Sequence, residues 1–257
     1  MISSAHNPKI QLVRALVAQP KERRQEKAFV VEGVRLLEEA LQARWPFRYA
    51  LFTGELSSRG ASLVRRLQAE NISCEQVEPR LFDTIADTEN SQGVLAVLEH
   101  ASLPVQETLS FALILDSIRD PGNLGTLLRT ASAAGVEAVF LPPETADAFA
   151  PKVVRAGMGA HFHVPIQSLS WEKIAERVKG LNVFLADMEG TLTCWEADFR
   201  SPLALLIGGE AEGATPPARQ LAQALISIPM PGKAESLNAA VAGAVLMFEV
   251  VRQRKLN

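Results

Sequence analysis

Short apolar runs alternate with amphipathic segments along most of the chain, a pattern typical of strands alternating with helices. Near the C-terminus, residues 204–207 form a continuous apolar run that stops at a pair of glycines. Such a run predicts a buried parallel strand, and the glycines predict a loop where the backbone approaches a ligand. Residues 225–230 repeat this arrangement. Pro229 and Pro231 cannot donate to a ladder, so we expect the end of this strand to bend away from the sheet.

The last apolar segment, residues 237–252, has helical character and carries Ser236 directly before it as a cap. Its first half is almost wholly apolar or small, so we expect a helix that is buried on most of its surface. Glu210 follows the first of the two strands. Two strand ends, a carboxylate and a capped helix start together predict a ligand crevice at the edge of an open α/β sheet.

The first hundred residues predict a separate small domain. Residues 7–19 place apolar side chains on one helical face, with a proline in the first turn behind an asparagine cap. Further strands are expected at 29–31, 49–52, 72–77 and 94–98, and further helices at 33–43, 61–70 and 80–85. This alternation builds an α/β layer large enough for an independent domain.

A linker and a second α/β domain follow. Residues 99–109 lose periodicity and contain a proline, so we expect domains at 1–99 and 109–257. In the second domain we expect strands at 111–118, 136–141, 162–166 and 183–186, helices at 124–134, 149–156 and 171–178, and a loop at 191–201. The two C-terminal strands and the last helix then complete the sheet.

Composition excludes several classes of protein. The 257 residues are 47% hydrophobic and 21% charged, as in globular proteins. No apolar run reaches membrane-spanning length and the start has no apolar signal core, so we expect a cytoplasmic protein without a membrane partner. The net charge of −3 argues against a protein that coats nucleic acid by charge alone. The two cysteines lie far apart and predict neither a disulfide framework nor a metal site.

One local excess of positive charge stands out near the N-terminus. From residue 9 to residue 27 the chain carries six lysines and arginines against two glutamates. This segment could contact phosphates. On charge alone, a solvated helix face and loop explain it equally well.

The segment after the first strand of the second domain carries candidate chemistry. A strand, a Pro-Gly-Asn turn and a helix start form an anion site from unpaired backbone N–H groups and the helix dipole. The glycines match neither a dinucleotide fingerprint nor a phosphate loop. Polar side chains recur along the helix at spacings of three and four, at Asn123, Thr126, Arg129 and Thr130. Arg129 suits a phosphate there; the alternative is a surface arginine paired with Asp120 or Glu144.

Three segments carry a family resemblance. They are DPGNLGTLLRTA from residue 120, IGGE from residue 207 with Gly213, and IPM from residue 228 followed by SLN from residue 236. In this order and spacing they resemble the motifs of the SpoU/TrmH family of SPOUT RNA methyltransferases. FVVEG from residue 29 and SQGVLAV from residue 91 resemble the L30-like substrate-binding domain of many members. The resemblance implies an α/β catalytic domain with a C-terminal trefoil knot, whose loops bind S-adenosylmethionine.

The resemblance also implies the catalytic residues, which are Asn123, Arg129, Glu210, Ser236 and Asn238. Arg129 matches the residue credited with activating the ribose 2′-hydroxyl. Because a guanidinium stays protonated, we interpret its role as holding a substrate phosphate and stabilising developing negative charge. Asn123 is expected to orient the hydroxyl or Arg129. Glu210 is expected to orient Arg129 or Asn238 or to accept a proton; capping the glycine-rich loop is an equal alternative.

Cofactor contacts are implied at Gly208, Gly213, Ile228, Met230 and Leu237, and at Met188 in a segment that closes over the donor. Several of these side chains fit simple packing as well, as is expected where the backbone binds. One position departs from the family pattern. Residues 155–157 read Arg-Ala-Gly where the family commonly has Arg-Ala-Ser, which weakens the assignment of Arg155 as an RNA contact.

The function implied is S-adenosylmethionine-dependent 2′-O-ribose methylation of RNA by a homodimer. The N-terminal domain favours large-subunit ribosomal RNA, with guanosine as the target base, over transfer RNA. A non-catalytic RNA-binding protein of the same fold is an alternative, although the retained polar residues of the site argue against it. An unrelated α/β nucleotide enzyme that uses the turn at 120–123 for phosphate is a third.

Overall fold

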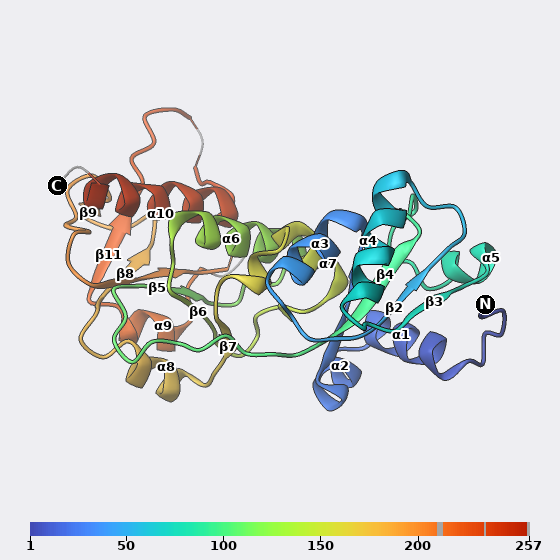
Figure 1. Ribbon diagram of the computed structural model, residues 1–257. Helices are drawn as coiled ribbons and strands as arrows, with labels where there is room; N and C mark the ends of the chain where they lie inside the picture. The colour runs from blue at the N-terminus through green and yellow to red at the C-terminus, as the bar shows by residue number, and fades with distance from the viewer. Residues whose placement is uncertain (210–212, 234, 256–257) are drawn as a thin grey trace. The chain divides into compact units, whose positions relative to one another are not determined.

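The computed structural model of the protein describes residues 1–209, 213–233 and 235–255 (Figure 1). The chain folds into two compact units. The first comprises Met1–Ser102 and Phe149–Phe162, and the second comprises Leu103–Ala148 and His163–Asn257. Among the described helices, none is both long and apolar enough to cross a membrane.

The first unit contains a four-stranded sheet in the order β1-β4-β2-β3. Its strands are β1 (Ala28–Glu32), β2 (Phe47–Phe52), β3 (Cys74–Gln76) and β4 (Val94–Glu99). β4 pairs antiparallel with β1 and β2, and β3 pairs parallel with β2. The helices along this part of the chain are α1 (Pro8–Ala18), α2 (Pro20–Glu26), α3 (Val34–Gln42), α4 (Ser58–Ala69) and α5 (Pro79–Asp83). The predicted strands and helices are all present, with ends shifted by a few residues.

Helix α1 forms as its apolar spacing predicts. Ile10, Val13 and Leu16 are fully buried against the sheet, and the Asn7 side chain caps the helix by accepting the Lys9 N–H at 2.9 Å. Helix α2 was not predicted, because its sequence is almost entirely polar.

The basic excess near the N-terminus is partly structural. Arg23 of α2 is only 3% exposed and donates to the carbonyl oxygens of Leu16 and Val17 at the end of α1. Lys9 pairs with Glu75 on β3. These two cations therefore support the fold, and Lys21, Arg24 and Lys27 are exposed.

The segment Phe149–Phe162 packs with the first unit, although the sequence pattern placed it in the second domain. It contains α7 (Pro151–Gly157) and a short 3-10 helix at Ala160–Phe162. The ring of Phe149 lies edge-on to Phe29, with centroids 5.0 Å apart, and Arg155 pairs with Asp87. Arg155 thus has a partner within its own unit. The strand predicted at 162–166 was wrong in position, since β7 spans Ile166–Ser168.

The second unit contains a seven-stranded parallel sheet in the order β7-β6-β5-β10-β8-β11-β9. Its remaining strands are β5 (Phe111–Leu115), β6 (Ala138–Leu141), β8 (Asn182–Ala186), β9 (Leu192–Thr193), β10 (Leu203–Ile207) and β11 (Ala224–Ser227). The buried apolar runs of β5 and β10 lie side by side in the middle of this sheet, as continuous apolar sequences predict. The two-residue β9 lies in a stretch predicted as loop.

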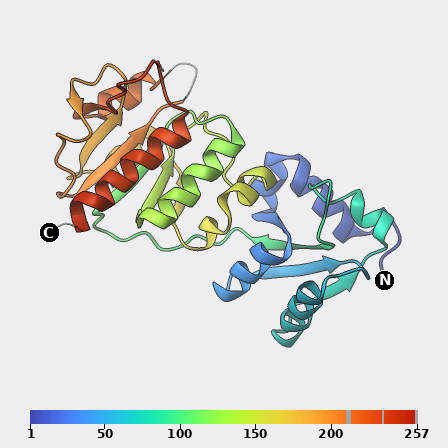
Figure 2. The same cartoon turned by 90° about the horizontal axis from the view of Figure 1, so that it is seen from above.

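Helices cover both faces of the seven-stranded sheet. They are α6 (Pro121–Ala134), α8 (Trp171–Arg177), α9 (Pro216–Leu221) and α10 (Ala239–Lys255). Figures 1 and 2 show α6 and α10 side by side on one face, where they contact each other, and Figure 1 shows α8 and α9 on the other. Helix α9 was not predicted. Its six residues are too few to show helical periodicity.

Helix α10 is buried on one face only, so the expectation that most of its surface is buried was wrong for the single chain. Ala240, Gly243, Leu246, Met247 and Val250 face the interior. On the outer side, three apolar residues are substantially exposed: Val241 at 49%, Val245 at 39% and Phe248 at 50%.

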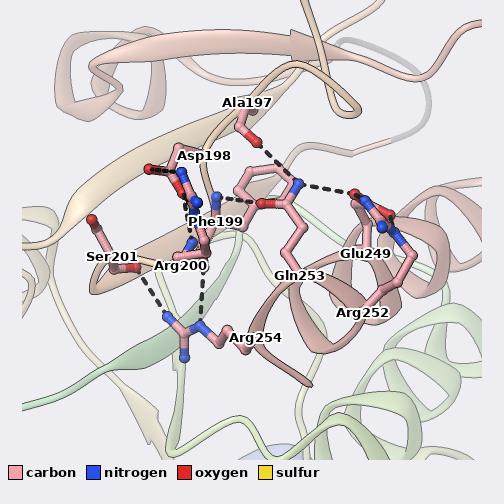
Figure 3. Close-up of polar contacts among 9 residues, drawn as sticks. All are labelled: Ala197, Asp198, Phe199, Arg200, Ser201, Glu249, Arg252, Gln253 and Arg254. Atoms are coloured by element: carbon pink, nitrogen blue, oxygen red, sulfur yellow. Dashed lines mark hydrogen bonds and ion pairs between the residues drawn. The ribbon is translucent and has the colours of Figure 1, made fainter. Parts of the chain in front are cut away.

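The end of α10 is held by Gln253 and Arg254 (Figure 3). Gln253 accepts the Phe199 N–H through Oε1 at 2.8 Å and donates through Nε2 to the Ala197 carbonyl oxygen at 3.0 Å. Arg254 donates to the carbonyl oxygens of Phe199 at 3.0 Å and of Ser110 at 2.9 Å. Phe199 precedes β10 and Ser110 precedes β5, so the helix end is fixed at the starts of two neighbouring strands.

Candidate active site

A cavity of about 620 Å³ lies at the carboxyl ends of β8, β10 and β11, beside the start of α10. Its described walls are formed by Ala186, Asp187, Met188, Glu189, Ile207, Gly208, Gly209, Gly213, Ala214, Arg219, Ile226, Ile228, Met230, Ser236, Leu237, Asn238, Ala239 and Ala242. The predicted crevice is therefore present, at the edge where parallel sheets place their ligands. All six residues predicted as cofactor contacts line it.

Gly208 and Gly209 are required by the backbone around them. A Cβ on Gly209 would lie 2.6 Å from the Ser117 carbonyl oxygen, and one on Gly208 would lie 2.8 Å from the Ala214 nitrogen. The sequence pattern predicted a close backbone approach to a ligand here. The atoms that exclude a side chain belong instead to the protein backbone. They lie at Ser117, after β5, and at Ala214, where the loop after β10 ends.

Asp116 fastens the returning end of this loop. It follows β5, is fully buried, and accepts the Thr215 N–H through Oδ2 at 2.7 Å. The sequence pattern predicted that the strand would run on to residue 118. It ends at Leu115, and Ser117 two residues later has a φ of +54°, outside the extended region.

Asn238, and not Ser236, caps α10. The Asn238 Oδ1 accepts the N–H groups of Ala240 at 2.9 Å and Val241 at 3.2 Å. The sequence pattern predicted Ser236 as the cap and placed Asn238 inside the first turn, which was wrong by two residues. Ser236 and Asn238 both line the cavity.

The cap brings two predicted catalytic residues together. Because backbone N–H groups can only donate, the Asn238 oxygen must face the helix, and its Nδ2 is left to point outward. That Nδ2 donates to Asn123 Oδ1 at 3.2 Å. Asn123 lies in the first turn of α6, where its own N–H donates to the Asp120 side chain at 2.8 Å. One backbone donor of the anion site expected at this helix start is therefore taken by Asp120.

Arg129 is exposed on α6 and is not among the described residues that line the cavity. It lies six residues beyond Asn123, or about 9 Å along the helix axis. Within the described part of the chain, its guanidinium forms no ion pair, with Asp120, Glu144 or any other carboxylate. The pairing that would have explained Arg129 as an ordinary surface residue is absent there. Glu210, the remaining predicted catalytic residue, lies outside the described residues.

An ion pair in the cavity wall was missed. Arg219 on α9 forms an ion pair with Asp187, which follows β8, with 2.7 Å between Nη2 and Oδ2. The two residues are far apart in sequence and no motif marks them. Thr215-Pro216-Pro217 offered the only local sign of a helix start, since proline is favoured in the first turn.

Side chains of metal-binding and nucleophilic types also occur among the described residues outside this cavity. Among the described residues, no three His, Cys, Asp or Glu side chains lie close enough to hold a metal ion. Both cysteines are free thiols. Burial raises the pKa of the Cys194 thiol, which favours the protonated, less reactive form.

Comparison with known proteins finds a family match in each half of the chain. Residues 110–248 match the model of the SpoU rRNA methylase family, and residues 7–96 match an MRM3-like substrate-binding domain. The chain belongs to the SpoU rRNA methylase family. In SpoU terms, the contact between Asn123 and Asn238 joins the first and third motifs.

Full-length SpoU relatives support this assignment. The Bacillus subtilis 23S rRNA (guanosine(2553)-2′-O)-methyltransferase RlmP is 32% identical, with 97% of this chain and 98% of the relative covered. The Streptomyces viridochromogenes 23S rRNA (uridine(2479)-2′-O)-methyltransferase is 32% identical, with 98% and 92% covered. The AdoMet-bound structure of an rRNA methyltransferase from Sinorhizobium meliloti superposes with a TM-score of 0.86 at 31% identity, over 98% of this chain and 97% of that one.

Proposed function

We propose that this SpoU chain transfers the methyl group of S-adenosylmethionine to a ribose 2′-hydroxyl of RNA, most specifically a guanosine of large-subunit ribosomal RNA in the cytoplasm. The hydrogen bond between Asn123 and Asn238 at the wall of the cavity carries the proposal. It connects Asn123 of the first motif to Asn238 of the third, and Asn238 lines the cavity. The MRM3-like match and the named relatives, which act on 23S rRNA, favour ribosomal over transfer RNA.

The cavity suits the cofactor in size and character. Its volume falls within the range of small-molecule sites, and Ile207, Ile226 and Ile228 give it an apolar wall. Glu189 adds negative charge, whereas the charge of Asp187 is paired with Arg219. When bound there, S-adenosylmethionine supplies a methyl group on a positively charged sulfur. The glycines and Leu237 would hold it through their backbone.

The protein groups position the nucleophile and balance its charge. A 2′-hydroxyl is weakly acidic, so negative charge on its oxygen must be stabilised as the bond to carbon forms. Asn123, fixed by Asn238, would orient the hydroxyl. Arg129 is exposed, and its positively charged guanidinium would hold an RNA phosphate and stabilise the developing charge.

We also propose that the protein works as a homodimer whose interface includes α10. Val241, Val245 and Phe248 recur at spacings of four and three, so they form one exposed apolar stripe. A second copy of the same helix would cover it symmetrically. Light scattering should give twice the chain mass for the wild type and the chain mass for Phe248→Glu. A monomeric wild type at micromolar concentration would contradict the dimer.

Transfer of labelled methyl from S-adenosylmethionine to total ribosomal and transfer RNA tests the reaction. Wild type and Arg129→Ala are compared, with nuclease-resistant 2′-O-methyl dinucleotides as the readout. We expect label in large-subunit RNA, with guanosine on the 5′ side of the resistant dinucleotide, and its loss in Arg129→Ala. Label only in transfer RNA, or only on uridine, would overturn the target. No transfer to RNA or to ribosomal particles by a folded, cofactor-binding protein would leave a non-catalytic RNA-binding role.

A further inference from the structure

The ion pair in the cavity wall has no part in the chemistry described above. Asp187 and Arg219 both line the cavity, and they come from two different connections of the sheet, the turn after β8 and helix α9. Their 2.7 Å contact therefore fixes a charged pair at a defined place in the site.

Asp187 is held and Arg219 is accessible. The Asp187 side chain is 10% exposed; its Oδ1 accepts the Glu189 N–H at 2.9 Å, and its Oδ2 meets Arg219. Its backbone N–H donates to the Ile226 carbonyl oxygen at 2.9 Å. The Arg219 side chain is 45% exposed. A guanidinium has five N–H donors, and the ion pair with Asp187 involves only its Nη2 end.

The pair lies away from the two asparagines. Asn123 belongs to the helix after β5, and Asp187 follows β8; β10 lies between these strands. Neighbouring strands are about 4.8 Å apart, so the ends of β5 and β8 are about 10 Å apart. A ligand whose reacting carbon lies near the asparagines would meet Arg219 with a distant part of its structure.

The charges of the cofactor indicate which of its groups would contact Arg219. S-adenosylmethionine carries a sulfonium and an ammonium, and its single anionic group is the methionine carboxylate. Among the described lining residues, Arg219 is the only cation, and its planar fork suits a carboxylate. The adjacent Glu189 is an acid that suits the ammonium. A carboxylate and a guanidinium in the wall of one cavity complement the ammonium and the carboxylate of an amino-acid head group.

We propose that Arg219 binds the methionine carboxylate of S-adenosylmethionine and that Asp187 positions its guanidinium. This inference rests on the proposed function, because it assumes that cofactor in this cavity. Arg219 is then a residue of cofactor recognition, and Asp187 acts through it.

Calorimetric binding of two nucleosides separates this role from a structural one. S-adenosylhomocysteine carries the amino-acid head, and 5′-methylthioadenosine lacks it while keeping the adenosine and the sulfur. We expect Arg219→Gln to weaken S-adenosylhomocysteine binding about tenfold or more, the cost of one lost charge-assisted hydrogen bond. Binding of 5′-methylthioadenosine should change less than twofold. Arg219→Lys should recover part of the loss, and Gln220→Ala, an exposed neighbour on α9, should bind both ligands as the wild type does.

Each result bears on a different claim. Equal weakening for both ligands, or none for S-adenosylhomocysteine, would overturn the role of Arg219 while the cofactor assignment stands. A wild type that binds neither ligand would overturn the cofactor assignment and this inference with it. Thermal melting distinguishes a misfolded Arg219→Gln from a folded variant that binds both ligands more weakly, and if Arg219→Gln misfolds, Arg219→Lys decides the question by the same ratio.

Discussion

The side-chain amide of Asn238 donates through Nδ2 to Oδ1 of Asn123 at 3.2 Å, across 115 residues of sequence. Two helix starts meet at this bond. Helix α10 lies against α6, and Gly243 allows the approach, since a Cβ there would lie 2.4 Å from Leu127 Cδ2. The capping bonds to the Asn238 oxygen then dictate which end of the amide faces Asn123. Helix packing and capping thus set the geometry of the site.

The variant Asn238→Asp separates capping from catalysis. Aspartate keeps the cap acceptor but has no donor for Asn123. We therefore expect its melting temperature to equal that of the wild type and its rate of methyl transfer to fall about tenfold or more. Asn238→Ala should lose both the cap and the bond to Asn123, and its free energy of unfolding should be lower by about 1 kcal/mol. Thermal melting and single-turnover methyl transfer measure the two effects. Full activity in Asn238→Asp would show that the contact between the asparagines is not needed.

Arg129→Ala should separate chemistry from cofactor binding. Because Arg129 is outside the described cavity wall, we expect unchanged affinity for S-adenosylhomocysteine. Loss of its charge should lower kcat by about a hundredfold or more, as for other groups that stabilise developing charge. Arg129→Lys keeps the positive charge without the planar guanidinium, so its kcat should lie between those of the wild type and Arg129→Ala. Rapid-quench methyl transfer and calorimetry are the measurements, and a parallel loss of cofactor affinity would contradict this role.

The site could be predicted from sequence as far as its signals are local. Asn123, Arg129 and Asn238 stand in short motifs, and the six positions predicted to contact the cofactor all line the cavity at the edge of the parallel sheet. The cap was misplaced because Ser236 is as good a capping residue as Asn238, and only the geometry of the first turn distinguishes them. The ion pair of Asp187 and Arg219 could not be predicted, because the two residues are brought together only by the fold and no local sequence pattern marks them.

The fold was predictable for the same reason. The prediction failed where tertiary contacts, and not the local sequence pattern, decide the structure. Buried strands such as β10 are marked by continuous apolar runs. Segment Phe149–Phe162 reads as an ordinary strand-to-strand connection, and its packing with the first unit depends on contacts such as Phe149 with Phe29. The trefoil knot came from the family resemblance and stays a prediction.

Gly209→Ala should damage the cavity through the backbone. The added Cβ would lie 2.6 Å from the Ser117 carbonyl oxygen, so the ends of β5 and β10 must separate. We expect unfolding to become about 1–3 kcal/mol easier, the range for overpacking, together with loss of S-adenosylhomocysteine binding. Gly232→Ala is the matched control, because a Cβ there meets no atom within 4 Å. Denaturant melts and calorimetry provide the comparison; a normal Gly209→Ala would show that this backbone contact can relax freely.

The pair of Glu249 and Arg252 near the end of α10 should make stability depend on acid (Figure 3). Glu249 accepts from Arg252 Nη2 at 2.6 Å, and this bond holds the pKa of the Glu249 carboxyl below its usual 4.5. When the folded pKa is the lower one, the ionised form stabilises the fold. That stabilisation is present above pH 4.5 and is lost as the pH falls through the folded pKa.

Denaturant midpoints measured at a series of pH values test this dependence. We expect Glu249→Gln to lower stability at neutral pH and to flatten the decline below pH 4.5. Arg252→Gln should flatten the same decline, because it removes the largest cause of the pKa shift and leaves the carboxyl itself in place. The double variant should add little to either single one, as for two residues that act through one contact. An Arg252→Gln protein that keeps the full acid dependence would place its origin in other carboxyl groups.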